Sequence, residues 1–557
     1  MTQLPDDPSP RVSIAPLLLL AAVALLALWP LTTFEFVRWD DPHNLPENPD
    51  MTPPRVQSVA RYWDPRQPYK DLYIPFTYTV WAGLACLAYM PGVDGPPLNA
   101  QVFHAANVLL HLLSSSVVFV ILLRLVRRTW AAWAGAAIFA VHPVQVEPVA
   151  WVSGMKDVLS GLLSLVAIWL YVEHALRRST ETRQSRAAWP LFAGATTAFA
   201  LAMLSKPSAV VVPLFVAAID LLLLRRPARR VAPLVLPWLI MAAIVAIIAR
   251  RAQPAAGLDF VPPLWGRPIV ALDAVAFYLR QIVFPMALAI DYGRSPQWLW
   301  NSRQVYFTWL LPVVLAVFLF MLRDKGRTVA VAALILVLGV LPVLGLVPFD
   351  FQAYSTVADH YLYLAMLGPA LLIAWIVAQS RGRYVIPFAT LMIVGFGVRS
   401  FAQTWSWQNS RALFAHTLTV NRFSLVGNVN HANLLSDEAI GAMRRQDYSE
   451  AAAKFTTAVH YYQLALRLRP HDAQAMIGLA NVYVLLGKPA DAVGLYTKAM
   501  EVQGRSGDLH AKLGRAYMML PDPTRALEHL NEALRLEPGH PTATVDLQTT
   551  LKRRSQP

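Results

Sequence analysis

The fold of this chain follows from its first long apolar run and the residues directly after it. Residues 12–42 read VSIAPLLLLAAVALLALWPLTTFEFVRWDDP. The apolar part, Val12 to Leu31, reaches the length of about 20 residues that a bilayer-spanning helix needs. It lacks a small-residue cleavage site, so we expect a retained membrane anchor. Asp40 and Asp41 follow it, which places two adjacent carboxylates where a membrane helix releases the chain into water.

The composition indicates a polytopic membrane protein. Of the 557 residues, 56% are hydrophobic and 15% are charged, and the mean hydropathy is +0.42. A soluble domain carries about a quarter charged residues. The net charge of +14 comes with Arg-rich loops between apolar runs, as at 225–230, so it does not predict a nucleic-acid partner. The one cysteine, Cys86, excludes an intramolecular disulfide.

Further apolar runs predict an all-α bundle of about eleven transmembrane helices over 12–400. The expected spans lie near 12–31, 102–123, 130–147, 157–175, 189–205, 207–224, 231–249, 305–322, 329–348, 361–378 and 384–400. Arg11 precedes the first span and an acidic stretch follows it, so we expect the tail 1–11 in the cytoplasm. Two long outer loops, 34–100 and 250–304, each carry an expected interfacial helix, at 74–90 and 272–290. An odd number of spans sends the C-terminus to the outer side.

The C-terminal part of the chain repeats. Leu479, Tyr483, Ala492 and Ala499 recur as Leu513, Tyr517, Ala526 and Ala533, at the 34-residue period of the tetratricopeptide repeat. An earlier unit ends near Pro470. After a connector at 401–429, we therefore expect about three repeats, an α-solenoid, at 430–551, and a basic tail at 552–557.

Ionisable residues collect at the expected outer ends of the spans. They are Asp40, Asp41, His142, Glu147, Lys156, Asp157, Lys206, Asp359 and His360. Such groups at membrane depth are costly, and they are usually functional or paired. The shared side of these groups favours a functional site, although Asp40 and Asp41 could form a turn, and His142 and Glu147 could cap helix ends and pair with each other.

The chemistry of these residue types allows specific roles. Asp40 or Asp41 could act as a general base on a hydroxyl, and we favour Asp41. Lys156, Lys206 or Arg294 could hold a phosphate. His104 and His111 are expected to be packed polar residues, and no metal-ligand motif such as H-E-x-x-H is present, so we expect no metal site.

These motifs resemble the GT-C-type membrane glycosyltransferases that carry C-terminal tetratricopeptide repeats. That family includes the transmembrane-and-tetratricopeptide-repeat protein O-mannosyltransferases and bacterial relatives. The resemblance lies in Trp39-Asp40-Asp41-Pro42, Glu47-Asn48-Pro49, Asn107 to His111, His142-Pro143-Val144 with Glu147, Trp151 to Gly154, Lys156-Asp157, Ser205-Lys206-Pro207 and Asp359-His360-Tyr361. One position departs from the pattern, because His360 stands where we expect an Arg.

The resemblance implies an inverting transfer of a sugar, with mannose expected. The donor would be a polyprenyl-phosphate carrier, and the acceptor a Ser or Thr hydroxyl of an envelope or secreted protein. One Asp of the pair would be the base, and Trp39, His43 and Tyr361 would lie near the sugar or acceptor. No cofactor is expected, since basic side chains can hold a single phosphate without a divalent metal. The repeats would bind the acceptor protein on the periplasmic side of a bacterial inner membrane.

Three alternatives remain from the sequence. The first is a transferase of the same architecture that acts on a glycolipid or polysaccharide. The second is a membrane-anchored repeat scaffold without enzymatic activity. A transporter is disfavoured, because the charges gather at one face and not at mid-membrane.

Overall fold

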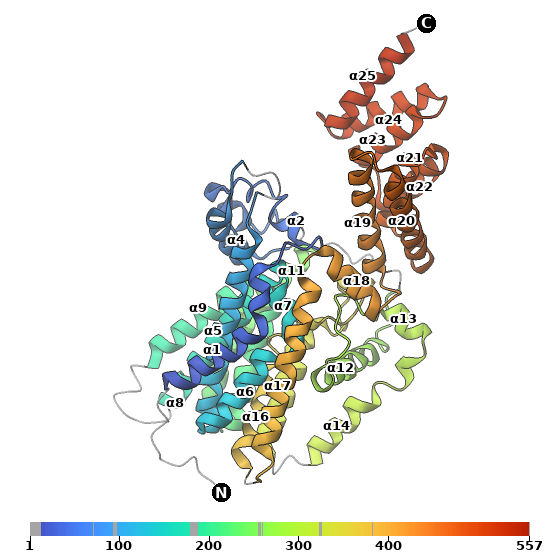
Figure 1. Cartoon of the computed structure of the whole chain (residues 1–557). Coiled ribbons are helices and arrows are strands. Elements are labelled where there is room, and N and C mark those ends of the chain that lie inside the picture. The colour runs from blue at the N-terminus through green and yellow to red at the C-terminus, as the bar shows by residue number, and fades with distance from the viewer. Residues whose placement is uncertain are drawn as a thin grey trace. The chain divides into compact units, whose positions relative to one another are not determined.

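The computed structural model describes residues 13–70, 72–92, 97–178, 188–253, 258, 260–321, 326–380 and 382–555. The regular elements in these ranges are helices, as expected for an all-α protein. The expected tail 1–11 and the last two residues of the tail 552–557 lie outside the described residues. So do most residues of two further basic stretches between expected spans, 177–186 and 323–327. The chain divides into two compact units, Met1–Leu413 and Phe414–Pro557 (Figure 1).

Each of the expected spans contains a helix. These helices are α1 (Ile14–Leu28), α5 (Ala100–Val126), α6 (Thr129–Val141), α8 (Met155–Arg177), α9 (Trp189–Ser205), α10 (Val212–Ala218), α11 (Ala228–Ala252), α14 (Leu310–Met321), α15 (Arg327–Val340), α16 (Leu367–Gln379) and α17 (Val385–Thr404). Within the described ranges, 6 helical stretches are long and apolar enough to cross a membrane, and others are shorter. These helices indicate a multi-pass membrane protein, while the count of eleven spans stays a prediction.

Several expected spans are shorter as helices than predicted: the run at 329–348 is α-helical only to Val340, and the helix expected at 361–378 begins at Leu367. The difference that bears on the site lies in the third expected span. The run predicted at 130–147 is helical only to Val141, where α6 stops. Pro143 and Pro148 follow, and the chain continues through the short segments η3 (Pro143–Gln145), α7 (Val146–Ala150) and η4 (Val152–Gly154) before α8 begins. Proline lacks a backbone N–H, so these two residues break the regular helix. Because of this break, Glu147 lies in a short segment at the end of the bundle and not within a membrane helix.

Small residues let the bundle helices approach closely. Helix α6 packs against α5 and α16, and α8 packs against α5 and α9 (Figure 1). A side chain at Gly135 of α6 would lie 2.3 Å from the carbonyl oxygen of Ala370 in α16. A side chain at Gly368 of α16 would lie 2.4 Å from the carbonyl oxygen of Ala332 in α15. Close backbone contact of this kind is the usual way in which membrane helices associate.

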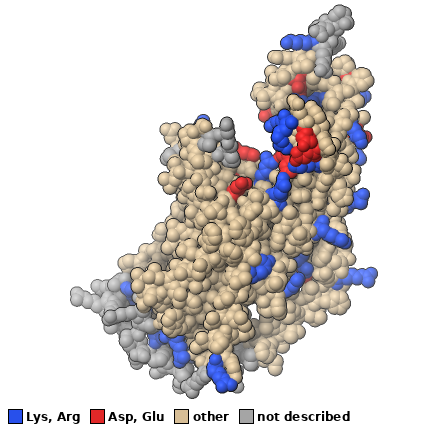
Figure 2. All heavy atoms as spheres, in the orientation of Figure 1, with Lys and Arg blue, Asp and Glu red and all other residues tan. Residues whose placement is uncertain are grey.

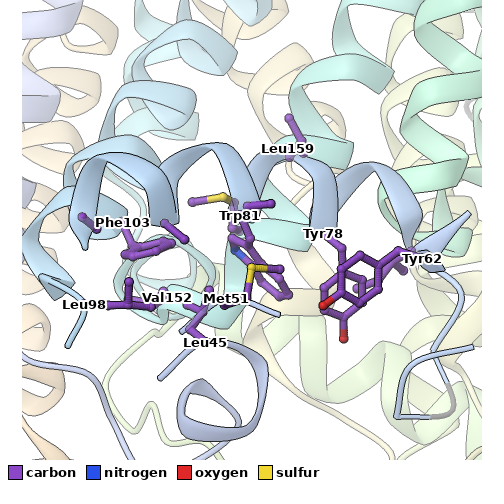
Figure 3. Packing of buried hydrophobic residues seen from close by; sticks show 14 residues of the cluster. Leu45, Met51, Tyr62, Tyr78, Trp81, Leu98, Phe103, Val152 and Leu159 are labelled. Carbon is purple, nitrogen blue, oxygen red and sulfur yellow. The ribbon is translucent and has the colours of Figure 1, made fainter. Parts of the chain in front are cut away.

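The first outer loop folds into a compact layer on the start of α8. It contains α2 (Asp41–Asn44), α3 (Val59–Tyr62) and the expected interfacial helix, observed as α4 (Pro75–Ala88). A buried cluster joins the loop to the bundle (Figure 3), with Leu45, Met51, Tyr62, Tyr78, Trp81 and Leu98 packed with Phe103, Val152 and Leu159. The rings of Tyr62 and Tyr78 are stacked 4.4 Å apart. This packing places the segment after Asp40 against residues 152–159.

The second outer loop contains α12 (Arg267–Val283), which begins earlier and ends earlier than the amphipathic run expected at 272–290. Pro285 follows directly and explains the early end. One face of α12 is buried through Val270, Ala274 and Phe277. The loop continues through α13 (Pro296–Asn301) to α14.

Charge is unevenly distributed over the surface of the first unit. On the face shown in Figure 2, Asp and Glu are visible at the end of this unit where α2 and α4 lie, while the rest of the bundle carries scattered Lys and Arg. The side chains between them are uncharged, which suits contact with lipid.

The second unit consists of helix pairs. They are α19 (Leu425–Arg444) with α20 (Tyr448–Leu468), α21 (Ala473–Leu485) with α22 (Pro489–Gln503), and α23 (Gly507–Met518) with α24 (Pro523–Leu536), followed by α25 (Pro541–Ser555). Asp447, Asp472, Ser506 and Asp522 cap helix N-termini with their side chains. The repeating residues Ala492, Ala499, Ala526 and Ala533 are fully buried, as close helix pairing requires. The expected repeat solenoid is confirmed.

A matched pair of glycine substitutions tests this packing. A side chain at Gly478 of α21 would lie 2.4 Å from the ring of Tyr462 in α20, whereas Gly494 of α22 has no atom within 4 Å of that position. We expect Gly478→Ala to destabilise the repeat unit by about 1–3 kcal/mol through overpacking. Gly494→Ala should stabilise it by about 0.5–1 kcal/mol, because alanine favours the helix. Calorimetric unfolding of both variants measures the difference, and equal effects would contradict the packing.

Candidate active site

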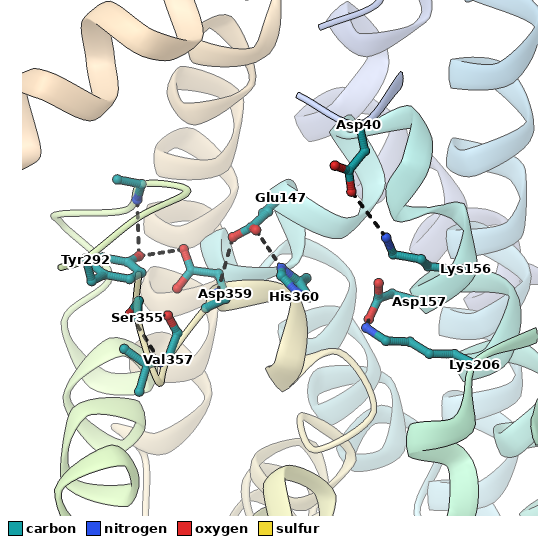
Figure 4. Close-up of polar contacts among 12 residues, drawn as sticks. Asp40, Glu147, Lys156, Asp157, Lys206, Tyr292, Ser355, Val357, Asp359 and His360 are labelled. Carbon is teal, nitrogen blue, oxygen red and sulfur yellow. Dashed lines mark hydrogen bonds and ion pairs between the residues drawn. The ribbon is translucent and has the colours of Figure 1, made fainter. Parts of the chain in front are cut away.

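Side chains from five separate segments meet at one end of the bundle (Figure 4). Asp40 precedes α2, and Glu147 lies in α7. Lys156 and Asp157 lie in the first turn of α8, and Lys206 follows the last residue of α9. Asp359 and His360 come from η11 (Asp359–Leu362). The fold therefore gathers residues that the sequence spreads over more than half of the chain.

Lys206 and Asp157 form a buried ion pair that joins α9 to α8. The Lys206 ammonium contacts Oδ1 of Asp157, and both side chains are at least four-fifths buried. The ammonium also lies 5.5 Å from the centre of the Tyr361 ring, within the range of a cation–π contact. Burial lowers the pKa of Lys206, and the Asp157 carboxylate opposes this effect. A pocket opens beside the pair, lined by Asp157, Lys206, His360 and Tyr361 together with Ser160, Ser208, Gly339 and Tyr363.

Asp40 is the most accessible acid of the cluster. Its carboxylate lies 3.7 Å from the ammonium of Lys156, and its side chain is 44% exposed, against 11% for Lys156. The Lys156 ammonium sits 4.5 Å from the Trp151 ring centre. Trp151 in turn lies 5.8 Å from the ring of His360, so it stands between the Asp40–Lys156 pair and the rest of the cluster.

The third part of the cluster is a chain of buried acids. His360 Nδ1 lies 2.6 Å from Oε1 of Glu147, and the Asp359 backbone N–H donates to Oε2 at 3.2 Å. The Tyr292 hydroxyl donates to Oδ2 of Asp359 at 2.7 Å (Figure 4). Burial raises the pKa of Glu147, and the charges of Asp359 and Asp157 add to the rise. Burial also raises the pKa of Asp359 to about 7, while the Tyr292 hydrogen bond opposes this.

The surroundings of His360 favour its neutral form. Burial lowers its pKa well below the usual value, and the positive charges of Lys206 and Lys156 lower it further. The departure from the family pattern, His where Arg is expected, therefore also removes a positive charge at this position. Lys156 and Lys206 are cations of the cluster, and the charge of Arg399 acts on Asp359.

Asp41 differs sharply from its neighbour. It is fully buried, and its carboxylate accepts three hydrogen bonds: from the Ser153 N–H at 2.9 Å, the Ser153 hydroxyl at 2.7 Å and the Val37 N–H at 3.1 Å. Burial raises the pKa of Asp41 to about 6, and these bonds pull against that shift. Because its acceptor sites are engaged by the protein, the geometry reverses our preference for Asp41 and favours Asp40 as the group open to a substrate.

Other expected site residues take structural positions. His142 accepts a hydrogen bond from the Val144 N–H, and its second ring nitrogen lies 2.9 Å from the Ile282 carbonyl, so it caps η3 and does not reach into the cluster. His43 pairs with Glu47 at 3.1 Å on the exposed surface. Trp39 is half-buried beside Asp40 in the chain. The pairing of Glu147 with His142 is wrong, because Glu147 contacts His360 instead.

Three further positions are clear from the structure. A guanidinium nitrogen of Arg294 donates to both carboxylate oxygens of Asp273, at 2.6 and 2.8 Å. Arg294, expected as a possible phosphate ligand, is thus paired with a carboxylate of the protein. His104 and His111 are buried and bond to backbone carbonyls, which confirms them as packed polar residues. Among the described residues, no group of three or more His, Cys, Asp and Glu side chains could hold a metal ion.

Sequence reasoning missed Tyr292, Ser153 and Trp151 as members of the site. Ser153 and Trp151 stand in a motif that carries the family resemblance, which was a usable signal. Tyr292 follows the amphipathic run of the second outer loop. Its spacing from Asp359, 67 residues away, carries no periodic signal.

Known proteins resemble this chain in the repeat unit and in the membrane unit. A tetratricopeptide-repeat family model matches residues 436–508 and 486–541. Protein O-mannosyl-transferase Tmtc2 of Drosophila melanogaster is 29% identical over 34% of this chain and 21% of its own length. Protein O-mannosyl-transferase TMTC1 of Mus musculus is 32% identical over 29% of this chain and 17% of its own, and mouse TMTC3 is 22% identical over 72% and 46%.

The homologues of this chain are protein O-mannosyl-transferases. The matched part spans less than half of the length of each of these relatives. The match to mouse TMTC3, over 72% of this chain, is too long to lie within the repeats alone. The likeness therefore includes the membrane unit that carries the cluster.

The raised pKa of Asp359 predicts a pH-dependent stability. A buried carboxyl that binds its proton more tightly when folded stabilises the folded state at low pH, and that contribution is lost as pH rises from about 4 through about 7. We expect the Asp359→Asn variant, which still accepts the Tyr292 hydrogen bond, to show a smaller fall in Tm between pH 5 and pH 8. Thermal unfolding of the purified protein at several pH values measures this. An unchanged pH profile would show that Asp359 does not titrate in this range.

Proposed function

We propose that this chain is a membrane glycosyltransferase that transfers a sugar from a polyprenyl-phosphate carrier to a Ser or Thr hydroxyl of a protein. The names of its homologues favour mannose as the sugar and a protein as the acceptor. The bundle of apolar helices suits a lipid-linked donor, which must reach the site from the membrane. The observation that carries the proposal is the accessible Asp40 carboxylate next to Lys156, at the edge of a buried cluster that holds a second cation.

Asp40 serves as the general base in this proposal. Its carboxylate takes the proton of the acceptor hydroxyl as the hydroxyl oxygen attacks the anomeric carbon. The bond between that carbon and the phosphate oxygen breaks, and the lipid phosphate leaves with the bonding electrons. A single displacement of this kind inverts the anomeric centre. The 44% exposure of Asp40 allows an acceptor to reach it, which the fully buried Asp41 does not.

Lys156 and Lys206 hold the phosphate in this proposal. Charge develops on the leaving phosphate, and ammonium groups in a water-poor site stabilise it strongly because the effective dielectric is low. Each lysine already rests against an aromatic face, Lys156 on Trp151 and Lys206 on Tyr361, which restricts its orientation. Each is also paired with a carboxylate, so the phosphate competes with Asp40 for Lys156 and with Asp157 for Lys206.

The repeat unit supplies the acceptor-binding surface in this proposal. Stacked helix pairs form an extended curved face that suits a peptide segment. We place the site and the repeats on the periplasmic side of a bacterial inner membrane, with the N-terminus in the cytoplasm, following the distribution of basic loops. No cofactor is required, since the lipid-linked sugar is itself the substrate.

The first test of this proposal is Asp40→Asn. The amide keeps the shape of the carboxylate but cannot accept the proton, so we expect kcat to fall by about 10²–10⁴-fold. Transfer of labelled mannose from a polyprenyl phosphate to a Ser/Thr peptide measures it. Asp64→Asn is the control, because Asp64 lies in the same outer loop and forms an ion pair with the exposed Arg66. Full activity of the Asp40→Asn variant would show that Asp40 is not the base. Transfer of the sugar to a lipid and not to the peptide would favour a glycolipid acceptor. Absence of transfer by the unaltered protein would favour a scaffold without enzymatic activity.

The second test concerns the two lysines. Lys206→Met removes a buried cation, and we expect the KM for the lipid donor to rise by about tenfold or more, with a fall in kcat. Lys206→Arg keeps the charge and should retain more activity than Lys206→Met. The same comparison applies to Lys156. If the methionine variants bind and use the donor as well as the unaltered protein, these lysines do not hold the phosphate.

A further inference from the structure

Behind Asp40 lies a continuous line of four buried polar side chains. The Tyr78 hydroxyl donates to Oδ1 of Asn44 at 3.1 Å, and the Asn44 amide nitrogen donates to the Ser153 hydroxyl oxygen at 3.1 Å. The Ser153 hydroxyl then donates to Oδ1 of Asp41 at 2.7 Å. The exposed fractions of the four residues are 1%, 7%, 0% and 0%, so water does not compete for these bonds.

All hydrogen bonds in this line point the same way. The amide oxygen of Asn44 accepts and its nitrogen donates, so the donor direction runs from Tyr78 to Asp41 without interruption. Bonds aligned in this manner polarise one another, and the line ends on a group that can only accept when it is ionised. The Val37 and Ser153 backbone N–H groups complete the set of donors to Asp41. These donors therefore fix the position of the Asp41 carboxylate, which accepts a hydrogen bond from each of them.

The line also connects the two segments that carry the base and its cation. Asp41, Asn44 and Val37 belong to the segment around Asp40, while Ser153 lies in η4, three residues before Lys156. Tyr78 comes from α4, in the layer packed against the start of α8 (Figure 3). Fixing Asp41 to Ser153 therefore fixes the distance between the neighbouring pair, Asp40 and Lys156.

We propose that Asp41, Ser153, Asn44 and Tyr78 are positioning residues that hold the Asp40 carboxylate in register with Lys156 for the transfer step. This inference rests on the proposed function, in which Asp40 is the base. The two adjacent aspartates then have separate tasks: Asp40 meets the substrate, and Asp41 anchors the backbone that carries Asp40. The outer layer contributes to catalysis through Tyr78, although Tyr78 does not touch the acceptor.

A positioning role makes a prediction that a purely structural role does not. Loss of the Ser153 hydroxyl leaves the lysines and the pocket unchanged, so the donor still binds. The misplaced base slows the chemical step, since small displacements of a reacting group cost about 10²-fold in rate. For Ser153→Ala we therefore expect kcat to fall by about 10- to 100-fold, the order of magnitude that such displacements cost. The KM for the donor should stay within about twofold of its original value. Ser153→Thr keeps a hydroxyl and should restore most of the rate.

The stacked tyrosines supply a matched control. Tyr78→Phe removes the first donor of the line, whereas Tyr62→Phe removes a hydroxyl of the same stack that bonds to Asn48 and Asp50. We expect Tyr78→Phe to lower kcat by roughly three- to tenfold, the factor expected for the loss of about one hydrogen bond. Tyr62→Phe should leave kcat unchanged while it changes Tm. If Ser153→Ala fails to fold, the comparison of Tyr78→Phe with Tyr62→Phe tests the positioning role.

The experiment uses the purified full-length protein, a mannosyl phosphate lipid and a Ser/Thr peptide, with kcat, both KM values and Tm measured for each variant. Unaltered protein that transfers sugar, together with an inactive Asp40→Asn, first establishes the reaction; failure at this stage counts against the proposed function alone. Given that activity, the positioning role is overturned if Ser153→Ala keeps its kcat. It is also overturned if Ser153→Thr does not restore the rate, or if Tyr62→Phe and Tyr78→Phe lower kcat equally.

Discussion

The Asp157–Lys206 ion pair is the interaction on which the rest of the site depends. An unpaired charge in a water-poor interior costs several kcal/mol, so neither residue could be buried at this depth without the other. Because Asp157 begins α8 and Lys206 follows α9, their contact draws the ends of these two helices together and shapes one wall of the pocket. Tyr361 then closes over the ammonium group and brings η11, with His360 and Asp359, to the same place. Removal of either partner would leave an uncompensated buried charge.

The same constraint explains how the buried acids are arranged. Glu147, Asp157 and Asp359 are nearly inaccessible, and the cations described near them are Lys156, Lys206 and Arg399. Burial raises the pKa of Glu147 and of Asp359, and donors such as Tyr292 and the Asp359 backbone N–H contact these carboxyls. Asp40 differs from these acids in that its side chain is partly exposed. The proposed base thus lies at the rim of a site whose buried carboxyls favour their uncharged forms, which suits the phosphate of the proposed donor.

Much of the fold could be predicted from the sequence, because helices and repeats depend on local patterns. Apolar runs located the membrane helices, and the alanine positions at the repeat period located the solenoid, since both rest on side-chain spacing within one element. The errors occurred where the chain is irregular. The span expected to 147 stops at Val141, because Pro143 and Pro148 interrupt it, and that interruption creates the short segments that carry Glu147 and Ser153. The positions of charged residues at helix ends predicted that these residues gather at one end of the bundle. They did not predict which of these residues pair with each other.

By itself, the sequence determined that this is an all-helical membrane chain with a repeat domain and that its acids, imidazoles and lysines lie at the ends of apolar helices. Only the tertiary structure decided which of these groups are buried against protein partners and which remain accessible. Asp40 and Asp41 are adjacent and chemically identical, and what separates them is a contact between Asp41 and Ser153, 112 residues apart in the chain. His142 and His360 are likewise the same residue type, yet one caps a turn and the other meets Glu147, 213 residues away. Burial and hydrogen-bond partners decide the role of an ionisable group, and both are set by segments that meet only in the folded protein.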